Sequence, residues 1–153
     1  MKALNTVKFQ FPSKSVNEGF ARSTVAAFAA QLDPTLDEIA DLKTAVSEAV
    51  TNCIVHGYPD GIGMITITAS IYDRNLLRIV VADKGVGIEN IQKAMEPMFT
   101  TGGPERAGLG FAVMESFTDK MKVSSKPGKG TRVTMTKRMG SRESVSSTRE
   151  GEV

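Results

Sequence analysis

The strongest constraint on the fold is a pair of apolar segments joined by a short polar turn. From Met64 to Tyr72, isoleucine and alanine alternate with threonine and serine, whereas Leu76 to Ala82 is an almost unbroken apolar run. The first pattern predicts a half-buried strand and the second a strand inside a sheet. The turn Asp73–Asn75 between them predicts an antiparallel hairpin. A hairpin here excludes the β-α-β unit that opens a dinucleotide-binding fold.

Two helices are predicted before this hairpin. An alternating strand from Val7 to Phe11 comes first and is ended by Pro12. Ser15–Glu18 and Thr35–Glu38 both match a capping box, so each predicts a helix start. We expect Arg22 to lie opposite the apolar face of the first helix, as a solvated charge. The predicted apolar face of the first helix is Val16, Phe20, Ala27, Phe28 and Leu32; that of the second, which runs to about His56, is Ile39, Leu42, Val46, Val50 and Cys53.

The second half of the chain is less regular. Residues 88–107 carry several glycines and prolines and predict a functional lid, because so long a connection is unusual in a compact domain. A short helix is expected from Phe111 to Phe117, followed by strands near Lys120–Ser124 and Thr131–Lys137. Residues 139–153 are polar and predict a disordered tail, which leaves a domain over residues 1–138.

The composition limits the function classes. The chain has 153 residues and a formal net charge of +2, too small to argue for a nucleic acid or membrane partner. No stretch resembles a transmembrane run or a secretory signal. One cysteine cannot form an internal disulfide, and a single cysteine with a single histidine argues against structural zinc. These features predict a cytoplasmic protein.

Glu48 and Asn52 are the first candidate site residues. They stand four residues apart on the second predicted helix, so their side chains project from one face. A carboxylate and a carboxamide in that arrangement can hold a divalent cation and orient a proton acceptor. If the two side chains are not on the surface, they line a pocket.

Two glycine-rich segments downstream could complete a nucleotide site. No P-loop is present, and Gly85-Val-Gly87 lacks the third glycine of the dinucleotide fingerprint. Asp83 at a strand end can accept a hydrogen bond from the exocyclic amine of adenine. Gly85 and Gly87 would let the backbone approach a base or sugar. Gly108 and Gly110 would present backbone N–H groups to phosphate at a helix start, with Arg106 ahead of them for a terminal phosphate. Any one of these pairs alone is more simply explained as turn glycines, but the combination favours a nucleotide.

With these segments in place, the chain resembles the gyrase, heat-shock chaperone and histidine-kinase ATPase superfamily over about residues 5–138. Within it, the chain is most similar to small serine kinases that act as anti-sigma factors in sporulation. The strings that carry the resemblance are Gly19-Phe-Ala-Arg22, Val25-Ala-Ala-Phe28, Gln31-Leu-Asp-Pro34, Ser47-Glu-Ala-Val-Thr-Asn52, His56-Gly-Tyr58 and Phe99-Thr-Thr101. The implied fold is an α+β two-layer sandwich, the Bergerat fold, with a mixed, mostly antiparallel sheet and helices on one face.

The resemblance also implies roles for individual residues. Asn52 would coordinate Mg²⁺ at the ATP phosphates, and Glu48 would be the general base or orienter for the attacking hydroxyl. Asp83 would recognise adenine, assisted by Thr131. Arg106 would contact the γ-phosphate, and Arg22 would contact partner proteins. Thr101, Gly85, Gly87, Gly108 and Gly110 would complete the ATP site. One departure stands in the lid, where Gly102-Gly103-Pro104 replaces the lysine and proline usual in this family.

The implied activity is that of an ATP-dependent protein serine kinase. It would sequester a sigma factor, phosphorylate an anti-anti-sigma protein on serine and form a homodimer, without contacting nucleic acid or membrane. Three alternatives remain open on the sequence. They are an anti-sigma kinase of the general stress response, a module that holds ATP only to shape a partner-binding surface, and a catalytic domain cut from a sensor histidine kinase. The last lacks a phospho-acceptor histidine helix, since His56 is the only histidine.

Overall fold

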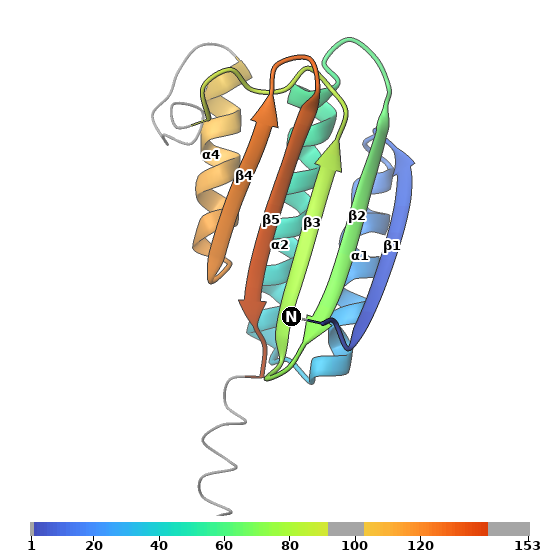
Figure 1. Ribbon diagram of the computed structural model, residues 1–153, viewed down its shortest axis with the longest axis vertical. Helices are drawn as coiled ribbons and strands as arrows, with labels where there is room; N and C mark the ends of the chain where they lie inside the picture. The colour runs from blue at the N-terminus through green and yellow to red at the C-terminus, as the bar shows by residue number, and fades with distance from the viewer. Residues whose placement is uncertain (1, 92–102, 141–153) are drawn as a thin grey trace, which may run out of the picture.

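The computed structural model describes residues 2–91 and 103–140 and has two layers (Figure 1). One layer is a sheet with strand order β1-β2-β3-β5-β4. Its strands are β1 (Asn5–Pro12), β2 (Met64–Tyr72), β3 (Leu76–Asp83), β4 (Lys120–Lys126) and β5 (Gly130–Arg138). The other layer contains α1 (Asn17–Ala29), α2 (Leu36–Asn52) and α4 (Gly103–Ser116), all on one face of the sheet (Figure 1). The predicted α+β sandwich is confirmed, except that every strand pairing is antiparallel, not mixed.

The predicted hairpin lies at the centre of the sheet. β2 pairs with β3 from Tyr72 opposite Leu76 to Ile65 opposite Asp83. Arg74 and Asn75 in the turn have φ of 63° and 59°, the left-handed region that asparagine tolerates. Because β5 pairs with the other edge of β3, the carboxyl end of β3 is flanked on both sides.

The two faces of the sheet differ in character. The odd-numbered residues of the strands point to the helices and form the core, including Ile65, Ile67, Ile79, Val81, Val133 and Met135, all at most 5% exposed. The even-numbered residues of the five strands form the opposite side, which we call the open face. The described helices leave this face uncovered (Figure 1).

Helix α1 departs from its predicted start and face. Val16 is its N-cap and makes no side-chain capping bond, so the capping box predicted at Ser15–Glu18 is wrong. The Glu18 carboxylate instead accepts hydrogen bonds from Arg22 and from Ser47 of α2. The predicted apolar face is only partly confirmed: Leu32 is in the core and Phe28 packs against it, but Val16, Phe20 and Ala27 are exposed. The buried face is made of small residues that let α1 pack closely, namely Ala21, Val25, Ala26 and Ala29.

Helix α2 confirms its predicted capping box and core stripe. The Thr35 hydroxyl accepts a hydrogen bond from the backbone N–H of Glu38, and the Glu38 carboxylate accepts one from the backbone N–H of Thr35. Leu42, Val46 and Val50 are at most 1% exposed. After Asn52 the helix widens into a π-type turn, η2 (Cys53–Gly57). A π-type turn inside a helix is rare and often marks a functional site.

Two predicted boundaries shift near the C-terminus. Helix α4 begins at Gly103, not at Phe111, so the expected irregular segment ends earlier. The lid prediction otherwise falls on residues 92–102, outside the described residues. Met139 is fully buried and the backbone N–H of Gly140 donates to Glu38, so the ordered domain reaches beyond 138. The tail predicted after that lies outside the described residues from 141. No helix of the described part is long and apolar enough to span a bilayer.

Candidate active site

Asp83 is a buried carboxylate held at the end of β3. It is only 8% exposed, and its Oδ1 accepts hydrogen bonds from the backbone N–H groups of Gly85 (2.9 Å) and Thr131 (3.2 Å). Its other oxygen faces Gly57, where an added Cβ would lie 2.8 Å from Oδ2. The two backbone donors fix the orientation of the carboxylate, because charge-assisted hydrogen bonds are among the stronger ones in proteins.

The loop after β3 is closed against the π-type turn. The backbone N–H of Val86 donates to the carbonyl of Gly57 at 2.9 Å. A Cβ on Gly85 would lie 1.9 Å from that same carbonyl oxygen, so only glycine fits there. Gly87 has φ of 77° and stands against the carbonyl of Lys126. Both glycines are thus required by the protein's own backbone, and their approach to a nucleotide stays a prediction.

Tyr58 joins the ends of β2 and β3. Its hydroxyl donates to the carbonyl of Met64 and accepts from the backbone N–H of Lys84, both at 2.7 Å. Its ring fills the space above Gly63, where an added Cβ would lie 2.2 Å from a ring carbon. No role for Tyr58 is predicted from the sequence. The string His56-Gly-Tyr58, directly after the helix, was the signal that could have found it.

Asn52 is the last residue of α2, and its side-chain amide nitrogen is buried. Its Nδ2 is buried and has no hydrogen-bond partner among the described residues. A buried donor left unpaired costs about 1–3 kcal/mol, so such groups call for an explanation, and a ligand is a common one. Gly110 of α4 lies directly against this side chain, since an added Cβ would be 2.9 Å from Asn52 Oδ1.

The two α4 glycines are not at a helix start. Gly108 and Gly110 lie inside α4, because the helix begins at Gly103. The prediction that they precede the helix is therefore wrong. Gly110 has a different structural use, which is to bring the backbone of α4 against the Asn52 carboxamide. Contact of either glycine with phosphate remains a prediction.

Glu48 lies one helical turn before Asn52. Its side chain is half-buried, so it is neither a core residue nor a fully solvated charge. Beside it on α2, the Ser47 hydroxyl donates to Glu18 Oε2 at 3.1 Å. Glu18 also forms an ion pair with Arg22 one turn later on α1. The hydrogen bond from Ser47 therefore joins this pair to α2. Arg22 is thus a paired, partly covered charge and not the plain solvated one expected.

Cys53 connects the two parts of the site. It follows Asn52 in the chain, and its buried thiol lies beside the Asp83 carboxylate. Burial raises the pKa of the Cys53 thiol well above its usual value, and the charge of Asp83 and a hydrogen bond with it raise that pKa further. Partial burial likewise raises the pKa of the Tyr58 hydroxyl, against an opposing hydrogen bond from the backbone of Lys84. Both groups are neutral donors at neutral pH.

The described residues offer few ligands for Mg²⁺. Among residues 2–91 and 103–140, no group of three or more His, Cys, Asp or Glu side chains could hold a metal ion. Magnesium, however, usually takes few protein ligands and completes its shell with waters and substrate phosphates. Because Mg²⁺ takes oxygen ligands, the atom that fits such a single-ligand site is Asn52 Oδ1, beside Gly110. The buried Nδ2 is a donor and would pair with an acceptor such as a phosphate oxygen.

The structure thus assembles part of the predicted site. It brings Asp83 together with Gly85 and Thr131, and Asn52 together with Gly110. Thr101 lies outside the described residues. For Arg106 and Gly108 only the helical backbone is described, so their side-chain roles stay predictions.

The comparisons with known proteins identify the family. A family model described as a histidine kinase-like ATPase domain matches residues 11–137. An anti-sigma F factor of Thermoanaerobacter sp. (strain X514) is 61% identical, and the match covers 92% of this chain and 99% of that protein. The chain belongs to the anti-sigma F factor family of histidine kinase-like ATPases. An anti-sigma F factor of Clostridium acetobutylicum is 58% identical over 88% of this chain and 94% of its own.

Solved structures support the fold. The RsbU and RsbW domains of Rv1364c from Mycobacterium tuberculosis match with a TM-score of 0.64 at 20% identity, over 88% of this chain and 32% of that one. The histidine kinase domain of a blue-light activated histidine kinase from Erythrobacter litoralis matches with a TM-score of 0.57 at 18% identity, over 88% and 64%. The resemblance found in the sequence is thus confirmed at the level of family and fold.

Proposed function

We propose that this chain is an anti-sigma factor that binds ATP and phosphorylates a partner protein on serine. The observation that carries the proposal is the presence of two features close together, at the end of β3 and the end of α2. One is the oriented, buried Asp83 carboxylate, and the other is the buried Asn52 amide, with Cys53 between them. An ATPase family membership over residues 11–137 supports ATP as the ligand.

The base end of ATP would lie at Asp83. Because Oδ1 is occupied by two backbone N–H groups, Oδ2 is the acceptor we assign to the exocyclic amine of adenine. A carboxylate there favours adenine over guanine, whose corresponding group is a carbonyl. Thr131, whose hydroxyl lies 2.8 Å from that of Ser125, would assist at the same edge.

The phosphate end of ATP would lie at the C-terminal part of α2. Asn52 would hold Mg²⁺, which when bound neutralises charge on the phosphates. Glu48, one turn earlier, would accept or align the proton of the attacking serine hydroxyl. Arg106 of α4 would pair with the γ-phosphate. Gly110, which has no Cβ, leaves the space beside α4 that the Asn52 carboxamide occupies.

The partners follow from the relatives. Those compared are named anti-sigma F factors, which supports a sporulation sigma factor as the protein that this chain sequesters in the cytoplasm. An anti-anti-sigma protein would be the serine substrate. The chain would act as a homodimer, with Arg22 on the surface that meets its partners.

The test is transfer of labelled γ-phosphate from Mg·ATP to a candidate anti-anti-sigma protein, with the acceptor residue mapped by mass spectrometry. We expect one phosphoserine on the partner. Binding of ATP without transfer to any such partner would instead support the module that uses ATP only to shape a surface. Capture of a stress-response sigma factor in place of the sporulation one would move the chain to the other pathway.

A further inference from the structure

The open face of the sheet is strongly basic. Within the five strands, Asp83 is the only carboxylate, and it points to the helical side. The cations of the open face are Lys8, Arg78, Lys120, Lys122, Lys126, Arg132 and Arg138. Of the fifteen remaining open-face positions, seven are threonine or serine, and none is acidic. Since the whole chain has a net charge of only +2, its charge is divided unequally between its surfaces.

The register spaces these cations apart. Arg132 lies opposite Ala82 on β3 and Ser124 on β4, and Lys122 lies opposite Thr134. No cation of the open face is directly opposite another in the strand pairings, which avoids the most unfavourable like-charge contacts. The cations thus avoid direct cross-strand repulsion, while no strand carboxylate on this face offsets their charge.

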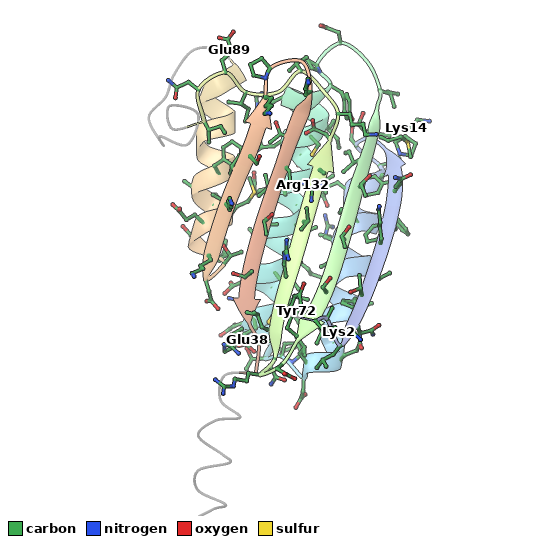
Figure 2. All side chains as sticks on the ribbon, in the orientation of Figure 1. Lys2, Lys14, Glu38, Tyr72, Glu89 and Arg132 are labelled. Atoms are coloured by element: carbon green, nitrogen blue, oxygen red, sulfur yellow. The ribbon has the colours of Figure 1, made fainter. Side chains whose placement is uncertain are left out.

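A hollow of about 310 Å³ concentrates this charge at one end of the open face. Ala82 and Gly130, which have little or no side chain, leave room in it, and Arg132, Lys126 and Lys129 line it. Figure 2 shows Arg132 on β5, on the side of the sheet turned away from the helices. Lys84 and the Ser124 and Ser125 residues also contribute to the lining.

The hollow shares Asp83 and Thr131 with the candidate ATP site, but it is lined mainly by open-face residues and the β4–β5 turn. Ala82, Ser124 and Arg132 are even-numbered strand residues and belong to the open face, whereas Asn52 and Gly57 are on the helical side. Asp83 and Thr131 line the hollow too, but the Asp83 carboxylate is engaged by backbone N–H groups and faces Gly57. Within the described part of the chain, none of Lys84, Lys126, Lys129 and Arg132 forms an ion pair.

We propose that the open face is a docking surface for an acidic segment of a partner protein, with carboxylates of that segment in the hollow. The Arg132 guanidinium can bind one carboxylate with two parallel hydrogen bonds, and the lysines supply point charges around it. The spread of cations from Lys8 on β1 to Lys126 on β4 fits an extended occupant better than a small anion.

Nucleic acid fits the surface less well. Tyr72 is the only aromatic residue among the open-face positions, and it is 9% exposed and accepts a hydrogen bond from Arg78. The face therefore has no exposed ring on which a base could stack. A flat sheet of five strands also cannot enter a groove of duplex DNA, which admits a helix or a two-stranded ribbon.

The proposal is tested with the full chain and a short peptide of glutamates at low salt. We expect amide NMR shifts on the strands of the open face, largest at the ends of β3 and β5 and in the β4–β5 turn. The double variant Lys126→Glu/Arg132→Glu should bind the peptide about tenfold more weakly, a size consistent with the loss of two exposed ion pairs and added repulsion. The neutral pair Lys126→Gln/Arg132→Gln should lie between this variant and the wild type.

The matched control is Lys2→Glu/Lys14→Glu, which makes the same change in net charge on exposed residues outside the open face. It should keep wild-type affinity. If the control variant bound the peptide equally weakly, the loss of affinity would come from net charge alone, and the proposal would be overturned. Tighter binding of a short DNA duplex than of the peptide, at the same salt and with the same shifts, would overturn it in favour of nucleic acid.

Discussion

The exchange Asp83→Asn should invert the purine preference of the site while leaving the fold intact. Asparagine retains an oxygen that can accept from Gly85 and Thr131, at the positions now 2.9 and 3.2 Å from Oδ1. The atom in place of Oδ2 becomes an N–H donor. That donor would face the exocyclic amine of adenine, where two donors cannot pair. Inosine triphosphate, which carries a carbonyl at the same ring position, could accept from it.

The magnitude follows from the hydrogen bonds involved. A hydrogen bond to a charged acceptor contributes about 1.5–3 kcal/mol, and each 1.4 kcal/mol is tenfold in affinity. ATP binding should therefore weaken by roughly ten- to more than a hundredfold, whereas the dissociation constant for inosine triphosphate should fall or stay unchanged. Oδ1 of a neutral amide is a weaker acceptor than a carboxylate, so unfolding free energy should drop by only about 1–2 kcal/mol.

The assay is calorimetric titration of wild type and variant with Mg·ATP and Mg·inosine triphosphate, with thermal unfolding as the control for folding. Unchanged ATP affinity in a folded Asp83→Asn protein would refute the placement of adenine at this carboxylate. Equal loss of both nucleotides would show that the residue supports the loop and does not read the base.

Three further perturbations test neighbouring features. Tyr58→Phe should lower the unfolding free energy by about 1–2 kcal/mol in chemical denaturation, since it removes two hydrogen bonds. In steady-state kinetics the same variant should raise KM for ATP more than it lowers kcat. Gly110→Ala should keep or raise the melting temperature, because alanine is favoured over glycine in a helix by about 1 kcal/mol. It should also weaken Mg·ATP binding by displacing the Asn52 side chain. Normal Mg·ATP binding would contradict a role for the contact between Gly110 and Asn52. The raised pKa of Cys53 contributes stability that is fully present below the ordinary thiol pKa of about 8.5 and is lost as pH rises through the raised value. Cys53→Ala should therefore flatten the fall in unfolding free energy at alkaline pH, as urea unfolding at several pH values would show.

Patterns set by local chemistry were predicted well from the sequence. The hairpin from Met64 to Asp83 and the Thr35 capping box depend on residues close in the chain, and both are confirmed. The capping box predicted for helix α1 was wrong because a contact with a residue far away in the chain decided the outcome. Its Glu18 is held by Ser47, which lies on another helix, and that contact replaced the local cap. A pattern read within one element carries no information about which distant side chain will compete for its polar groups.

In the candidate site, too, features visible in the local sequence were predicted and features that depend on distant contacts were not. Asn52 and Asp83 were found because their chemistry is visible as single residues in a motif. The roles of Gly57 and Gly85 were not, because each depends on a backbone approach between segments far apart in the chain. The helix start at Gly103 was missed because glycine and proline near it predicted a loop, although proline is well tolerated in the first turn of a helix.

In the proposed kinase site, Glu48 of α2 accepts or aligns the proton of the serine hydroxyl. Single-turnover transfer of γ-phosphate from saturating Mg·ATP to the anti-anti-sigma partner tests this role most directly, with wild type compared to Glu48→Gln. We expect the variant to lose transfer by at least about a hundredfold, within the range of one general base, and to bind ATP as the wild type does. Transfer at the wild-type rate by the folded variant would contradict it.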